Sequence, residues 1–65
     1  MPNIVQQLMA EIARVQGLVA TLGEADQRQA ETLLRYGRQS MALNRYEEMR
    51  EALDDLATFG NEVDD

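Results

Sequence analysis

The feature that most constrains this fold is a change of phase in the apolar residues between positions 30 and 59. Two sets of residues recur there at helical spacing, the first Leu33, Leu34, Tyr36, Gly37 and Met41, the second Tyr46, Met49, Leu53 and Leu56. One straight helix would bury only one set, whereas a turn near Asn44 lets both sets face the same core. Asn44 followed three residues later by Glu47 is also a spacing typical of a helix N-cap. The sequence therefore predicts two helices, at about 25–42 and 45–59, folded back on each other.

The alternative is one unbroken helix from position 24 to position 59. At about 1.5 Å per residue it would be about 54 Å long, against about 30 Å for a helix over 3–22. A second chain would then have to cover the excess length. The two architectures assign different places to Asn44, which is an N-cap in one and lies within a helix in the other.

Residues 3–22 carry the most regular periodicity in the chain. Apolar residues alternate there at spacings of three and four through six positions: Val5, Leu8, Ile12, Val15, Val19 and Leu22. Such a heptad stripe predicts a helix that packs along another helix. We expect Asn3 to cap its start, and Gly23 to end it in a left-handed backbone conformation. The short connection that follows requires the next helix to run antiparallel.

The size of the chain favours self-association. With 65 residues it forms one domain at most, and a core of this size rarely supplies more than a few kcal/mol of stability. We therefore expect the six stripe residues to form the interface of a homo-oligomer. Helix-forming Leu, Ala, Met, Glu, Gln and Arg dominate the composition, so the expected fold is all-α. It is either a short helical hairpin or a three-helix unit over residues 1–60 that assembles as a helical bundle. Gly60 and Asn61 act as a stop signal, and 61–65 form an acidic, frayed tail.

The composition disfavours several classes of function. The absence of Cys and His excludes disulfides, thiolate chemistry and imidazole-based metal sites or proton shuttles. The carboxylates have the spacing of a solvated helix surface, so we expect no enzymatic activity, no cofactor and no metal. A net charge of −6 disfavours nucleic-acid binding, which depends on basic contacts to phosphates. The first residues carry neither a basic region nor a long apolar run, so we expect no signal sequence, no membrane contact and a cytoplasmic location.

Three side chains are candidates for binding another protein. Tyr36 and Tyr46 combine an apolar ring with a polar tip, and Met41 is a flexible apolar side chain of the kind found in adaptable binding surfaces. The leading hypothesis is a small non-enzymatic interaction module of bacterial or phage origin, such as an adaptor, chaperone or inhibitor. It would act as a homo-oligomer that binds a second protein.

All six basic residues are Arg, which recognises carboxylates and phosphates through planar, bidentate contacts. Arg28, Arg35 and Arg38 are predicted to share one face of the second helix, and Arg45 lies at the turn. Together they form a candidate anion-binding strip, so the alternative function is an oligomer that captures an anionic small molecule such as a nucleotide. The same pattern is explained by a solvated surface in which Glu31 pairs with Arg28 and Arg35, and Glu47 or Glu48 pairs with Arg50 or Arg45.

Residues 30–59 resemble a single tetratricopeptide-type repeat, a helix-turn-helix unit of about 34 residues. Tyr36-Gly37 occupies the family's first-helix position, and Asn44 to Met49 occupies the start of the second helix, with Leu53 and Leu56 following. The chain departs from that pattern at Ser40, where an aromatic residue is usual, and at Met49, where Ala is usual. It also lacks the terminal Pro.

Residues 22–34 and 56–61 faintly resemble the small plasmid-copy-number regulators that form an antiparallel four-helix bundle and bind paired RNA loops. The first helix lacks the Lys and the aromatic residue through which that family contacts RNA. The resemblance therefore implies a dimer of helical hairpins, and an RNA-binding bundle is the third function considered.

Overall fold

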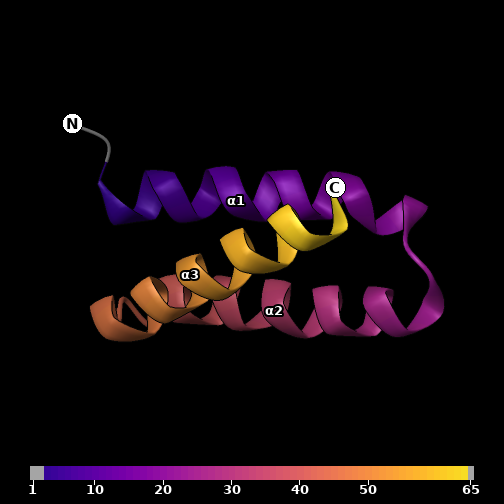
Figure 1. Ribbon diagram of the computed structural model, residues 1–65. Helices are drawn as coiled ribbons and strands as arrows, with labels where there is room; N and C mark the ends of the chain where they lie inside the picture. Colours follow the sequence, from indigo (N-terminus) through magenta and orange to yellow (C-terminus); the bar gives the residue numbers. More distant parts are fainter. Residues whose placement is uncertain (1–2, 65) are drawn as a thin grey trace.

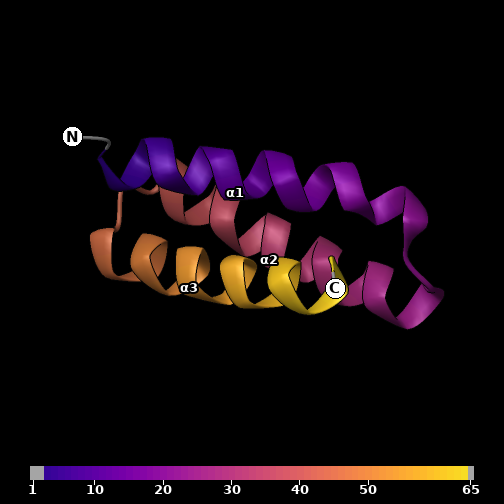
Figure 2. The same cartoon turned by 45° about the horizontal axis from the view of Figure 1, so that its top comes forward.

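The computed structural model describes residues 3–64, which form a bundle of three α-helices (Figure 1). Helix α1 spans Ile4–Leu18 and is followed by a 3₁₀ turn, η1, at Val19–Thr21; α2 spans Glu24–Ala42 and α3 spans Tyr46–Val63. Helices α1 and α2 run antiparallel, and α3 turns back to lie against both of them on one side, as Figures 1 and 2 show together. The all-α prediction is confirmed. No helix within 3–64 is both long and apolar enough to cross a bilayer.

The start of α1 follows the prediction, but its end does not. The Asn3 side chain caps the helix by accepting a hydrogen bond of 2.9 Å from the Gln6 backbone N–H. Gly23 was expected to be left-handed, and this is wrong: its backbone is extended (φ −68°, ψ 167°), and it is the N-cap of α2. The helix gives way to η1 after Leu18, and Leu22 then donates its N–H to the Val19 carbonyl at 3.1 Å. This tight turn reverses the chain without a left-handed residue.

The predicted break near Asn44 is confirmed, and the unbroken helix is excluded. Asn44 is not an N-cap, however: it is left-handed (φ 53°) and lies one residue beyond the C-cap of α2. The Asn44 N–H donates to the Met41 carbonyl, and the Arg45 N–H to the Ser40 carbonyl, each at 3.1 Å. These two bonds define a Schellman motif, in which Asn is a common substitute for Gly. Arg45 is the N-cap of α3 and makes no capping bond with its side chain.

Helix α3 continues past the stop expected at Gly60 and Asn61, because Arg14 of α1 packs against its last turns. Gly60 is buried beneath the Arg14 guanidinium, and a Cβ on Gly60 would come within 2.5 Å of Arg14 Nη2. Arg14 also donates to the Ala57 carbonyl at 3.4 Å and to Asn61 Oδ1 at 3.3 Å. The helix therefore includes residues 61–63 of the predicted tail and ends at Val63 rather than at Phe59.

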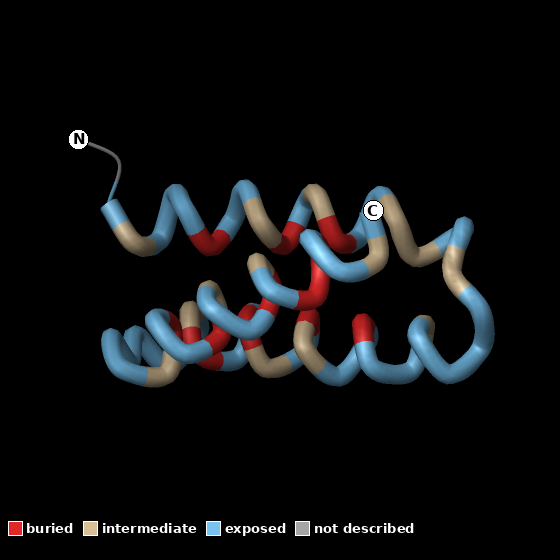
Figure 3. The backbone as a smooth tube through the Cα atoms, viewed as in Figure 1, coloured by how far each residue is buried: buried red, intermediate tan, exposed pale blue. Residues whose placement is uncertain are grey.

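The core lies where the three helices meet (Figure 3). Its buried apolar residues are Leu8, Ile12 and Val15 of α1, Ala30 and Leu34 of α2, and Met49, Ala52, Leu56 and Phe59 of α3. At the centre, a Cβ on Gly37 would lie 3.3 Å from Ile12 Cδ1 and from Leu56 Cδ1, so this glycine lets the three helices approach closely. Half of the α1 stripe thus packs inside the chain. Of the rest, Val19 and Leu22 pack at the edge of the core, whereas Val5 is 36% exposed.

Candidate interaction surface

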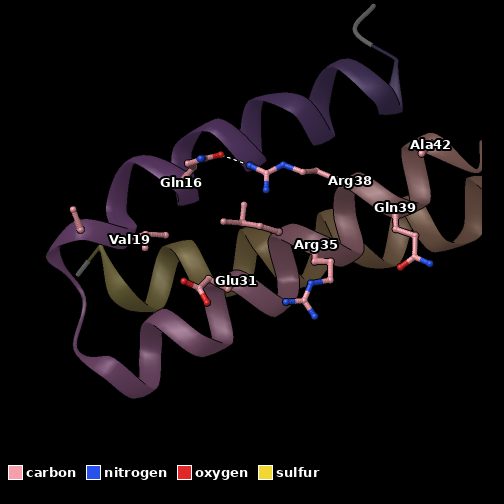
Figure 4. Close-up of a pocket in the computed structure, with 9 residues that line it drawn as sticks. Gln16, Val19, Glu31, Arg35, Arg38, Gln39 and Ala42 are labelled. Carbon is pink, nitrogen blue, oxygen red and sulfur yellow. Dashed lines mark hydrogen bonds between the residues drawn. The ribbon is translucent and has the colours of Figure 1, made fainter.

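An open groove runs between α1 and α2 on the side opposite α3 (Figure 4). Its volume is about 860 Å³, and it is lined by Gln16, Val19, Ala20, Glu31, Leu34, Arg35, Arg38, Gln39 and Ala42. The groove exists because α1 packs mainly on α3 and makes its fewest helix contacts with α2. Between Glu31 and Ala42 it follows α2 for about 16 Å, or three helical turns. We call this side of the molecule the groove face.

The α1 part of the groove face carries no charge. Four residues of α1 and one of η1, spaced four, four, three and four apart, share one side: Val5, Met9, Ala13, Gln16 and Ala20. The two charged residues of α1, Glu11 and Arg14, pair with each other at 3.0 Å, and Arg14 reaches toward α3. Met9 is 56% exposed and Val5 36%. An exposed helix face without charge is typical of the central part of a protein interface.

The structure brings together only two of the four arginines of the predicted strip. Arg35 and Arg38 line the groove. Arg28 instead pairs with Glu24 at 2.7 Å, and Arg45 pairs with Glu48 at 3.7 Å across the first turn of α3. The expected pairing of Glu31 with Arg28 or Arg35 is therefore not formed.

The charged groups of the groove point in different directions. The Arg38 side chain crosses the groove and donates a hydrogen bond to Gln16 Oε1, as Figure 4 shows. Arg35 extends along the outer flank of α2, away from α1. Within residues 3–64, neither Arg35, Arg38 nor Glu31 has an oppositely charged partner. The groove face thus combines an uncharged side of α1 with three residues of α2 whose charges are unpaired within residues 3–64.

The three residues proposed to bind a protein differ in how far they are exposed. Tyr36 and Met41 are half-buried and pack against the core. The Tyr36 hydroxyl donates to Glu51 Oε2 at 3.4 Å, and partial desolvation together with the charge of Glu51 raises the pKa of Tyr36. Tyr46 is 59% exposed at the start of α3, close in sequence to Leu43, which is 51% exposed at the turn. Leu43 was not predicted from the sequence, since it lies between the two helical stripes.

The described residues contain no group of three or more carboxylates placed to hold a metal ion. Comparison with known protein families, with characterised proteins and with solved structures gives no match to this chain. The tetratricopeptide-type and regulator-like patterns thus remain resemblances of sequence pattern.

Proposed function

We propose that this chain is a small, non-enzymatic protein–protein interaction module that works as a homo-oligomer and binds through its groove face. An adaptor, a chaperone and an inhibitor are the roles that such a module fills. The observation that carries the proposal is the uncharged, exposed side of α1 beside the open groove. A helix of another chain that packs against this face would be the fourth helix of the bundle and would cover both Val5 and Met9.

The distribution of charge supports the same face. Six of the twelve acidic residues lie on α3, and five of these six are exposed: Glu47, Glu51, Asp54, Asp55 and Glu62. A densely charged surface of one sign resists close packing with another protein, because the charges must be desolvated. The groove face lacks this barrier on α1. It also offers Arg38, which binds carboxylates bidentately, on α2.

The proposal is tested by placing a charge on the α1 side of the groove face. We expect Met9→Asp to dissociate the oligomer, because an unpaired carboxylate at an apolar contact is costly, and to leave the helix content unchanged because Met9 is exposed. Thr58→Asp adds the same charge on the exposed side of α3 and serves as the matched control. Sedimentation velocity and circular dichroism measure the two effects. If Met9→Asp and Thr58→Asp assemble equally well, the groove face is not the interface.

Capture of an anionic small molecule is the second candidate, favoured by Arg35 and Arg38 lining one groove without a carboxylate partner. It requires that a nucleotide raise the melting temperature by mass action and that added salt weaken this effect. Changing both arginines to Gln should remove the shift, whereas Arg50→Gln on α3 should preserve it. A panel of nucleotides that gives no shift, or a shift that survives in the double variant, eliminates this candidate.

A further inference from the structure

We propose that two copies of this chain pair groove face to groove face about a twofold axis that crosses α2 between Leu34 and Arg35. Glu31 of each copy then pairs with Arg38 of the other copy. The inference rests on the proposed homo-oligomer and goes beyond it, because it names the axis, the register and the ion pairs.

The charges along α2 are self-complementary. Glu31 and Arg38 lie seven residues apart on the same side of α2, both are exposed, and neither has a charged partner within residues 3–64. About 10 Å of helix separates them, so they do not meet within one chain. A twofold axis between positions 34 and 35 sets two α2 helices antiparallel, with position 31 of each opposite position 38 of the other. Glu31 of each copy then faces Arg38 of the other copy, so the contact contains two ion pairs.

The same axis also suits the residues of α1, which were not used to place it. Gly37 lies close to the tip of the Ile12 side chain, and α1 and α2 are antiparallel, so an axis that crosses the middle of α2 also crosses the middle of α1. The uncharged row of α1, which includes Met9, Ala13 and Gln16, then faces the same row of the second copy. No charged residue of α1 is buried in this contact.

The arrangement of charges favours a second copy over other occupants. A carboxylate-bearing helix of another protein, or a small anion, would satisfy Arg38 but would bring negative charge toward Glu31. A second copy satisfies both residues at once. Arg38 would exchange its hydrogen bond to the neutral Gln16 amide for a stronger, charge-assisted bond to a carboxylate. Arg35 points along the outer flank of α2 and remains in water at the rim of the contact.

Charge reversal provides the first test. Glu31→Arg alone and Arg38→Glu alone each place like charges opposite one another, and we expect each to weaken dimerisation at least tenfold. The double variant, with both reversals in one chain, restores both pairs and should dimerise like the wild type. The two single variants are also complementary to each other, so an equimolar mixture should form heterodimers. Sedimentation and native mass spectrometry measure these outcomes.

Two reversals on α3 serve as matched controls, because Glu47→Arg and Arg50→Glu make the same charge changes away from the groove face. They should leave dimerisation close to that of the wild type. If the wild type dimerises but the groove-face variants behave like these controls, or their mixture forms no heterodimer, the axis is wrong and the homo-oligomer stands. If the wild type does not dimerise, both proposals fail.

Cross-linking provides a second test with a covalent readout. The chain contains no Cys, so engineered thiols are the sole source of disulfides. Glu31→Cys and Arg38→Cys in one chain cannot bridge within it, since about 10 Å of α2 separates them. Between copies the two positions lie opposite each other, and we expect the double variant to form a disulfide-linked dimer under mild oxidation. Each single variant should remain uncross-linked. Equal cross-linking of single and double variants would refute the register.

Discussion

The left-handed residue between α2 and α3 gives the sharpest test of the fold. At φ 53°, Asn44 adopts a conformation in which a Cβ crowds the following carbonyl oxygen, at a cost of roughly 1–2 kcal/mol for most residues. Asn tolerates it better than most, and Gly has no Cβ to crowd. We therefore expect Asn44→Ser to lower the free energy of unfolding by about 1 kcal/mol. Asn44→Gly should change it by less than about 0.5 kcal/mol.

The choice of Ser separates the two roles that Asn44 can have. As an N-cap, Ser is about as good as Asn, so Asn44→Ser would then be neutral. A loss of about 1 kcal/mol corresponds to a fall in melting temperature of about 4–8 °C for a domain of this size. Thermal and urea unfolding followed by circular dichroism measure it, at one fixed protein concentration because the proposed homo-oligomer would couple unfolding to assembly. A neutral Asn44→Ser with a destabilising Asn44→Gly would refute the Schellman assignment.

Three further predictions follow from single contacts. Arg45→Ser creates a capping box with Glu48 at the start of α3 in place of an exposed ion pair, and should raise the free energy of unfolding by about 0.5–1 kcal/mol; a loss of stability in urea would contradict this. Gly60→Ala should be nearly neutral in the wild type, because the gain of about 1 kcal/mol in helix propensity is offset when Arg14 is displaced from Ala57. In an Arg14→Ala background the same change should be fully stabilising, and a double-mutant cycle measures the difference. The raised pKa of Tyr36 means that the folded state retains this proton more strongly than the unfolded state does. The resulting contribution of Tyr36 to the free energy of unfolding is present below about pH 10 and is lost as the pH rises through the folded-state pKa. We therefore expect the free energy of unfolding to decline less above about pH 10 in Tyr36→Phe than in the wild type.

The helices themselves were predictable from sequence, because their signals are local. The break near position 44 followed from the phase of the apolar stripes, and the Asn3 cap followed from its place before a helical run. The role of Asn44 was not predictable in the same way, because Asn is favourable both as an N-cap and as the left-handed residue beyond a helix. Gly60 reads locally as a stop signal, and the contact that keeps it helical comes from Arg14, far away in the chain.

The candidate site shows the same division between local and distant information. Periodicity showed that one side of α1 is buried, but it did not distinguish burial by the chain's own helices from burial by a second copy. Leu8, Ile12 and Val15 pack inside the chain. Any second chain must therefore contact another side of α1. The sequence contains a signal for that side, since Met9 and Ala20 belong to a helical row without a charge. This row can be interpreted as a binding surface only once the structure shows that it lies beside the groove.

Sedimentation equilibrium of the wild-type chain tests the central claim most directly. The chain has a mass of 7.4 kDa, so the account predicts that the measured mass rises with concentration to twice this value at micromolar concentrations. High salt should shift the equilibrium toward the monomer, because ion pairs contribute to the contact. A folded chain that stays at 7.4 kDa across this concentration range would contradict the account.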